Sequence, residues 1–163
     1  MKEPSNQPRT VRTEAVAPPS IRLVISSRLE NVFLVGLAVN KICSHLELDE
    51  VEAGRVELCI VEAVTNSIRH SHQGLSGLDV SLEVTVLEDS IEFKILDHGA
   101  HIPPEKLRSP RLDYDPGDVN NLPEGGMGIF LMHEVMDRVT YEPGNGTNTL
   151  TLVILRTPTN RTS

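Results

Sequence analysis

The amino-acid sequence predicts an α+β domain in two layers, with a mixed, mostly antiparallel sheet covered on one face by about three helices. Segments with strand-like alternation occur in neighbouring pairs, and segments with helical periodicity lie between these pairs instead of alternating with single strands. The 163 residues suffice for one domain with its own core and are too few for two. We therefore expect one domain over residues 21–158, preceded by a disordered arm (1–20) and followed by a short tail (159–163).

The composition is that of a globular protein with an aliphatic core, because apolar residues make up 39% of the chain and aromatic residues 3%. The net charge of −8 and the lack of a basic run argue against direct nucleic-acid binding and favour a protein partner or a small ligand. The polar, Pro-rich start resembles neither a signal peptide nor a membrane anchor, and no window approaches the ~20 apolar residues of a membrane span. Cys43 and Cys59 lie in helix-patterned segments without CxxC spacing, which predicts buried, reduced thiols and a cytoplasmic protein.

The first half of the domain begins with a short strand, Ile21–Ile25, and continues with two helical patterns. In the first pattern, Ser27 and Glu30 have the S-x-x-E spacing of a capping box. The second pattern starts near Asp49, and we expect it to break or restart around Gly54, because glycine is a poor helix former. The apolar positions at helical spacing are Leu29, Val32, Leu37, Val39, Ile42, Cys43 and Leu46 in the first helix, and Leu58, Val61, Val64 and Ile68 in the second.

The second half begins with two alternating segments, 78–86 and 91–97, which predict an antiparallel hairpin with one solvent-facing side. Residues 98–124 are rich in Pro, Gly, Asp and Asn and form an unusually long loop, so we expect a lid there. The remaining elements are a third helix over 128–139, a strand over 139–143 and a last strand over 147–155.

Three glycines, Gly125, Gly126 and Gly128, run into the third helix in the segment LPEGGMGIFLM. Glycine inside a helix costs about 1 kcal/mol relative to alanine, so we expect a compensating role. Backbone N–H groups at a helix start bind anions, which makes this a candidate phosphate site; the alternative is a plain loop-to-helix junction. A Rossmann fingerprint is excluded because a long loop precedes the cluster, and a P-loop because the Lys-Ser/Thr pair is missing.

Glu62 and Asn66 are four residues apart on the second helix, so their side chains project from one face, with Arg69 and His70 a turn further on. Such a stripe is either the solvated face of the helix or one wall of a site.

Asp97 shares the parity of the apolar residues of its strand, so its carboxylate points to the core side where the strand ends. A buried carboxylate needs a strong donor, such as a protein N–H or the exocyclic amine of a purine. Gly99 follows and lets backbone or ligand approach closely, although Asp-x-Gly also suits an ordinary strand-end turn.

Taken in order, these features resemble the GHKL-type ATP-binding fold of histidine kinases, gyrase-like ATPases and anti-sigma-factor kinases. EAVTNSIRH resembles the N box, DHGAHIP the first glycine box and EGGMGIFLM the second. Because the chain is one small domain that lacks the aromatic F-box motif, it most resembles the RsbW-type anti-sigma-factor serine/threonine kinases, over residues 21–156. The resemblance implies a GHKL (Bergerat-type) fold.

The resemblance also implies roles for individual residues. Asn66 would coordinate the Mg²⁺ that bridges the ATP phosphates, Glu62 would be the general base or orient the nucleophile, and Asp97 would accept from the adenine amino group. A Thr near the start of the last strand would lie under the adenine; Thr149 fits best and Thr147 is the alternative. The implied nucleotide-binding set is Asn66, Arg69, His70, Asp97, Gly99, Ile102, Gly125, Gly126, Met127, Gly128, Ile129 and Thr149.

Two positions depart from the family pattern. His101 replaces the second glycine of D-x-G-x-G, and Glu124 stands where some relatives carry an arginine. Candidates for the cation at the transferred phosphate are Arg69, Lys106, Arg108 and Arg111. We expect no zinc site, because the histidines that could suggest one are scattered over helix and loop: His70, His72, His98 and His101.

By this resemblance, the chain would be a Mg·ATP-dependent protein serine/threonine kinase and anti-sigma factor. It would bind a sigma factor, phosphorylate a STAS-type antagonist and form a homodimer. The alternative is a binding module that uses ATP as a structural ligand and sequesters a regulator without kinase turnover. A detached catalytic half of a histidine kinase fits less well, because His45 and His133 lie within helices of the domain itself.

Overall fold

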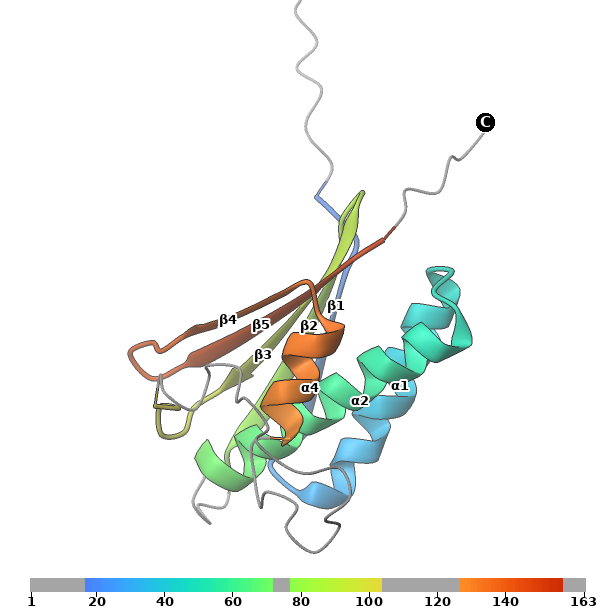
Figure 1. Cartoon of the computed structure of the whole chain (residues 1–163). Coiled ribbons are helices and arrows are strands. Elements are labelled where there is room, and N and C mark those ends of the chain that lie inside the picture. Colours follow the sequence, from blue (N-terminus) through green and yellow to red (C-terminus); the bar gives the residue numbers. More distant parts are fainter. Residues whose placement is uncertain (1–16, 72–76, 104–126, 157–163) are drawn as a thin grey trace, which may run out of the picture.

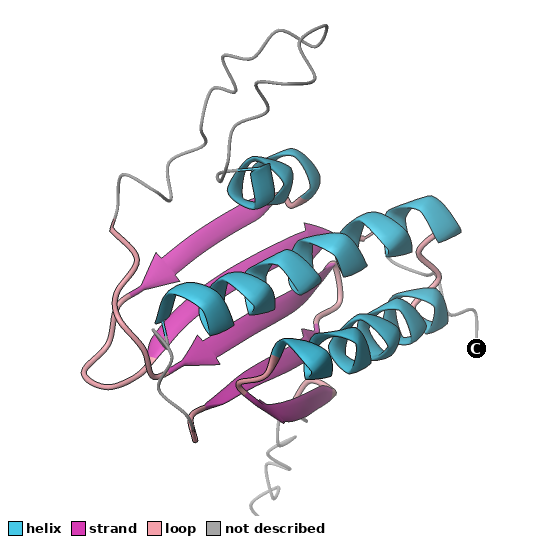
Figure 2. Ribbon diagram, turned by 90° about the horizontal axis from the view of Figure 1, so that it is seen from below, coloured by secondary structure: helices cyan, strands magenta, loops and turns pink. Residues whose placement is uncertain are grey.

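A computed structural model describes residues 17–71, 77–103 and 127–156 of the chain. Within these residues, a five-stranded sheet is covered on one face by three α-helices (Figures 1 and 2). All four strand pairs are antiparallel, so the predicted two-layer α+β class is confirmed. The predicted tail, most of the arm and residues 104–124 of the predicted lid lie outside the described residues.

The elements follow the predicted order. In spatial order the strands are β1 (Ser20–Ser26), β2 (Asp79–Val86), β3 (Ser90–Asp97), β5 (Asn148–Leu155) and β4 (Arg138–Glu142). The helices are α1 (Val32–His45), α2 (Glu50–Asn66), which continues in a π-helical turn (Ser67–Ser71), and α4 (Met127–Val135).

Helix α1 begins later than the capping box predicts. A 3-10 turn, Leu29–Asn31, precedes it, and the α-helix starts at Val32 instead of directly after Ser27. The Asn31 amide donates backwards to the main-chain oxygen of Ser26 at 3.2 Å and to its Oγ at 2.8 Å. These bonds fix the corner between β1 and α1.

Helix α2 runs through Gly54 without interruption, so the predicted break is wrong. Its first turn is capped by the Asp49 carboxylate, which accepts from the Glu52 N–H at 2.8 Å. Ala53 and Val56, on either side of the glycine, are fully buried. Capping and burial offset the roughly 1 kcal/mol that one glycine costs a helix.

The buried faces of α1 and α2 differ in part from the predicted apolar positions. Leu37 and Leu58 are 62% and 48% exposed, and Leu29 is exposed as well, whereas Val35 and Ile60 are buried in the core. Both helices carry more apolar side chains than one face can hold, so apolar spacing alone could not select the buried face.

Helices α1 and α2 form a closely packed hairpin. A Cβ at Gly36 would lie 3.1 Å from Glu57 Oε1, and the Asn40 amide donates to Glu57 Oε2 at 2.7 Å. Glycine at position 36 thus gives the Glu57 carboxylate room between the helices.

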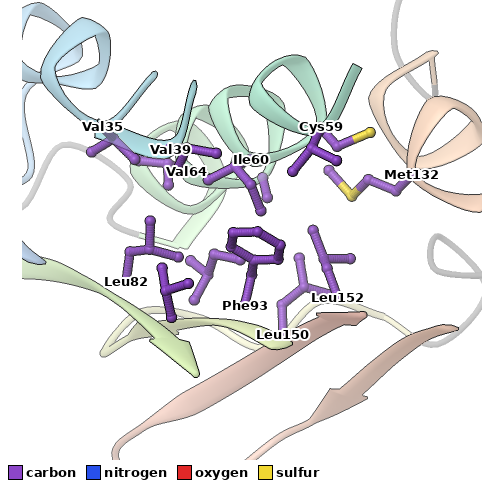
Figure 3. Packing of buried hydrophobic residues seen from close by; sticks show 14 of the residues in the cluster. Val35, Val39, Cys59, Ile60, Val64, Leu82, Phe93, Met132, Leu150 and Leu152 are labelled. Atoms are coloured by element: carbon purple, nitrogen blue, oxygen red, sulfur yellow. The ribbon is translucent and has the colours of Figure 1, made fainter. Parts of the chain in front are cut away.

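The core lies between the helical layer and the sheet, around the buried ring of Phe93 (Figure 3). The side chains around it are mostly aliphatic, as predicted. Figure 3 labels Val35, Val39, Cys59, Ile60, Val64 and Met132 on the helices, and Leu82, Leu150 and Leu152 on the strands. No helix in the described part of the chain is long and apolar enough to cross a membrane.

Cys43 and Cys59 are both free and buried, as the sequence predicts. Burial, and secondarily the charge of Glu57, raises the pKa of Cys43 to about 11. Burial, and secondarily the charge of Glu62, raises the pKa of Cys59 to about 12. Both side chains are therefore neutral thiols at physiological pH and contribute as small apolar groups.

Helix α4 ends at Val135, four residues before the predicted end. Asp137 then anchors the chain to β5, because its N–H donates to the Val153 oxygen at 2.9 Å and its carboxylate accepts from the Leu155 N–H at 2.7 Å. Strand β4 starts at the next residue.

Candidate functional site

Glu62 and Asn66 face the first turn of α4. A Cβ built on Gly128 would lie 2.8 Å from Glu62 Oε2 and 3.3 Å from Asn66 Nδ2. The first distance is shorter than a Cβ contact allows, so a residue larger than glycine would displace the Glu62 carboxylate. The structure therefore brings the predicted N-box residues and one glycine of the second glycine box into direct contact.

The contact between α2 and α4 continues one turn away. The Cys59 thiol donates to the Leu131 main-chain oxygen at 3.7 Å, and the charge of Glu62 contributes to the raised pKa of Cys59. The Glu62 carboxylate thus lies at the interface of the two helices.

Glu62 and Asn66 are half-buried, and neither side chain forms a hydrogen bond or ion pair with another residue in the described ranges. As far as the described residues go, their oxygen atoms remain available to a ligand. Mg²⁺ is commonly bound by one or two protein oxygens together with substrate phosphates and water, so the single amide oxygen of Asn66 suits this ion. The chemistry of these residues fits the magnesium ion that the family resemblance implies.

Asp97 ends β3 as a buried carboxylate, 3% exposed. Its Oδ1 accepts from the Gly99 N–H at 2.9 Å and from Asn148 Nδ2 at 3.0 Å. Its Oδ2 accepts from none of the residues that the structure describes. The sequence predicted a buried carboxylate that needs a strong donor, and the Gly99 N–H and Asn148 Nδ2 are such donors.

Asn148 is the main partner of Asp97, and the sequence did not reveal it. It is 1% exposed and lies directly opposite Asp97 in the β3–β5 register. Besides its bond to Asp97, Nδ2 donates to the Gly99 oxygen at 3.1 Å, and Oδ1 lies 2.6 Å from His101 Nδ1. The only sequence signal was that Asn148 shares the strand parity of the buried Leu150.

Thr149 does not lie beside Asp97. Side chains alternate along a strand, and Asn148 and the buried Leu150 face the core, so Thr149, paired with Leu96, faces the other side of the sheet. Thr147, the alternative, instead places its Oγ1 3.2 Å from His98 Nδ1.

The loop after β3 is fastened to the β4–β5 hairpin. His98 Nδ1 lies 2.7 Å from the Gly146 oxygen, and the Ile102 N–H donates to the Tyr141 hydroxyl at 2.9 Å. Burial raises the pKa of Tyr141 and the Asp97 charge adds to this, while the bond from Ile102 lowers it. These bonds attach the segment 98–103 to the β4–β5 hairpin.

The other predicted residues have different positions. Arg69 is exposed in the π-helical turn after Asn66, and His70 belongs to the same turn. Met127, the first residue of α4, is exposed, and Ile129 is half-buried. Several predicted residues lie outside the described part: His72, Lys106, Arg108, Arg111, Glu124, Gly125 and Gly126. Among the described residues, no three His, Cys, Asp or Glu side chains form a group that could hold a metal.

The C-terminal ends of α2 and β3 and the start of α4 lie towards one end of the domain (Figure 1). Two groups of polar residues lie at this end. We call Glu62, Asn66 and Gly128 the helix side of the site, and Asp97, Asn148 and His101 the sheet side.

Comparison with known proteins gives similarity over most of the chain. The sequence profile of the family described as "Histidine kinase-like ATPase domain" matches residues 25–154. The serine-protein kinase RsbW of Listeria monocytogenes serovar 1/2a is 28% identical over 120 residues, which cover 73% of this chain and 76% of that protein. The serine-protein kinase RsbW of Bacillus subtilis strain 168 is 26% identical over 127 residues, covering 77% and 79%.

Solved structures share the fold. The RsbU and RsbW domains of a Mycobacterium tuberculosis protein align with a TM-score of 0.57 at 15% identity, over 86% of this chain and 33% of that longer chain. A structure of the SiaB–SiaC complex from Pseudomonas aeruginosa aligns with a TM-score of 0.50 at 12% identity, over 82% and 89%. At these identities the alignments establish the fold alone.

Proposed function

This chain belongs to the family of histidine kinase-like ATPase domains, and we propose that it is a Mg·ATP-dependent protein serine/threonine kinase that also acts as an anti-sigma factor. The expected enzyme class, a protein serine kinase that uses ATP, agrees with the curated relatives, which are named serine-protein kinases. Its substrate would be a STAS-type antagonist, its second partner a sigma factor, and its assembly a homodimer.

The observation that carries the proposal is the contact at Gly128. The first turn of α4 approaches Glu62 and Asn66 so closely that a single added carbon would meet the Glu62 carboxylate at 2.8 Å. A helix start with free N–H groups attracts phosphate oxygens, and here it lies next to a carboxylate and an amide with no partners in the described residues. Phosphate, metal ion and hydroxyl substrate could meet at this point.

In this proposal, the residues of the helix side have separate tasks. The Asn66 amide oxygen holds the metal ion, which, when bound, neutralises charge on the phosphates. Glu62 accepts the proton of the substrate hydroxyl as that oxygen bonds to the γ-phosphorus and the bond to the β,γ-bridging oxygen breaks, leaving ADP. N–H groups of Gly125, Gly126, Met127 and Gly128 hold the phosphates, and Arg69, His70 and Ile129 line the same region.

The sheet side would hold the base. Asp97 presents Oδ2, which has no donor among the residues the structure describes, to the adenine amino group. A carboxylate can only accept, so it suits an exocyclic amine. Gly99 and Ile102 belong to the adjoining loop, which is bonded to Asp97 and Tyr141.

The proposal is tested by incubating the full chain with γ-labelled ATP, Mg²⁺ and the STAS-type antagonist, and by comparing Glu62→Gln with Glu50→Gln. Both substitutions remove one negative charge from α2, but Glu50 lies in its first turn, far from Gly128. We expect Glu62→Gln to slow the appearance of phosphoserine or phosphothreonine by roughly 10²–10⁴-fold and to leave ATP affinity nearly unchanged. Glu50→Gln should match the parent.

Two results would count against parts of this proposal. Equal rates for parent and Glu62→Gln would remove the base role. A parent chain that binds ATP and its partner tightly but never transfers phosphate would support the alternative function, a binding module without kinase turnover. The departures at His101 and Glu124 favour this alternative.

A further inference from the structure

Asn148 lies between Asp97 and His101 and contacts both. We propose that His101 and Asn148 are positioning residues that orient the Asp97 carboxylate, so that this chain selects the 6-amino group of its nucleotide through a three-residue relay. The inference rests on the proposed function and deepens it. It also gives a role to His101, which stands where many relatives have a glycine.

The first step is the use of the Asn148 amide. Its nitrogen carries two hydrogens, and the two shortest contacts of Nδ2 are with Asp97 Oδ1 at 3.0 Å and with the Gly99 oxygen at 3.1 Å. Asn148 is 1% exposed, so water cannot easily replace these partners. The two hydrogens of the amide nitrogen are therefore donated to the Asp97 carboxylate and to the turn that follows it.

The second step is the role of His101. Because Asn148 Nδ2 is the donor, Oδ1 must accept, and His101 Nδ1 at 2.6 Å must carry the hydrogen. A rotated amide would place its oxygen against the Asp97 carboxylate and its nitrogen against this N–H, which are two repulsive contacts. The imidazole therefore fixes the orientation of the amide from the far side.

The third step concerns Asp97. Two donors, the Gly99 N–H and Asn148 Nδ2, converge on Oδ1 and leave Oδ2 as its open acceptor within the described residues. Without Asn148, the Gly99 N–H would be the one remaining donor to the carboxylate among the described residues, and the plane of the carboxylate could turn. The direction in which Oδ2 is presented thus depends on residues that do not touch the base.

The experiment measures binding of two magnesium nucleotides to the full chain by isothermal titration. The nucleotides are ATP and purine riboside 5′-triphosphate, which lacks only the 6-amino group. A hydrogen bond to a charged group predicts that the parent prefers ATP by roughly 10- to 100-fold. This ratio reports recognition of the amino group, whereas a general loss of fold would weaken both nucleotides together.

Four variants are compared with the parent. Asn148→Val should reduce the preference for ATP to roughly threefold or less. Asn148→Thr introduces a side chain of nearly the same shape as valine but with a hydroxyl donor, and it should keep most of the preference. His101→Ala, at an exposed position, should reduce the ratio by a smaller factor than Asn148→Val. Thr151→Val, on the opposite face of the same strand, should leave the ratio unchanged.

The outcomes separate the two levels of inference. A parent chain that binds neither nucleotide contradicts the proposed function itself. A parent that prefers ATP, with a folded Asn148→Val variant that prefers it equally, overturns the relay alone. If Asn148→Val does not fold, His101→Ala decides, and an unchanged ratio in that variant overturns the relay.

Discussion

The two sides of the site are built in opposite ways. On the sheet side, Asp97 Oδ1 and the Asn148 amide are hydrogen-bonded to neighbouring residues, and Asp97 Oδ2 has no donor within the described ranges. On the helix side, Glu62 and Asn66 have no such partners among the described residues, and the shape of Gly128 gives them room. One side is organised before a ligand arrives, and the other is left open for groups that the ligand brings.

The difference follows from burial. A carboxylate that is 3% exposed is costly unless donors compensate its charge, so the network on the sheet side contributes to stability. Half-buried side chains remain partly hydrated, so the helix side can leave its oxygens without protein partners at little cost in stability. Substitutions should therefore affect binding and catalysis on the helix side, and binding together with stability on the sheet side.

The largest effect that would sharpen this contrast is expected for Asn66→Ala. Removing the amide oxygen should abolish the Mg²⁺-dependent part of ATP affinity and lower the rate of phosphoryl transfer by at least about 100-fold. The measurement is isothermal titration of ATP with and without Mg²⁺, alongside the kinase assay.

Asn40→Ala is the control for that variant, because the Asn40 amide is bonded to Glu57 at 2.7 Å in the α1–α2 hairpin. It should lower the free energy of unfolding by about 1–3 kcal/mol and leave the Mg²⁺ dependence intact. Equal loss of Mg²⁺ dependence in both variants would mean that Asn66 acts only through the fold.

A smaller effect is expected for Gly128→Ala, which tests whether shape alone organises the helix side. Its Cβ would meet Glu62 Oε2 at 2.8 Å, so the carboxylate must move, and we expect a loss of activity of about tenfold or more. Gly54→Ala is the matched control, since its Cβ would meet nothing within 4 Å. It should stabilise α2 by up to about 1 kcal/mol and leave activity unchanged. Parent-like kinetics for Gly128→Ala would mean that the close approach of Gly128 does not organise the helix side.

The smallest effect is expected for Tyr141→Phe, on the sheet side. The Ile102 N–H loses its acceptor at 2.9 Å, which should cost about 1 kcal/mol of unfolding free energy and weaken ATP binding only a few-fold. Thermal unfolding and titration with ATP measure the two quantities. A Tyr141→Phe variant that keeps its stability but loses turnover would indicate that this hydroxyl takes part in catalysis. The sheet side would then contribute to phosphoryl transfer as well as to binding.

Much of the fold could be predicted from the sequence because it depends on local periodicity. The β2–β3 hairpin and the order of elements followed from alternation and helical spacing. The start of α1, the continuity of α2 at Gly54 and the exposure of Leu37 and Leu58 did not, because tertiary packing decides them.

The site, too, could be predicted from the sequence only in part. Three motifs in order predicted the family, which the matching profile confirms. The resemblance assigned Thr149 to the adenine, and no role was predicted for Asn148, which the structure places against Asp97. That pairing depends on the register between β3 and β5, two strands separated by about 50 positions, and strand parity cannot fix such a register without the partner strand.

The site draws on four elements, α2, β3, α4 and β5, whose residues run from Glu62 to Asn148. An unfolded chain cannot bring these segments together, so a nucleotide that binds here recognises only the native state. By mass action, a ligand at a hundred times its dissociation constant would add about 2.7 kcal/mol to the free energy of unfolding. The concentration of free nucleotide would then help to set the lifetime of this protein in the cell, in addition to its activity.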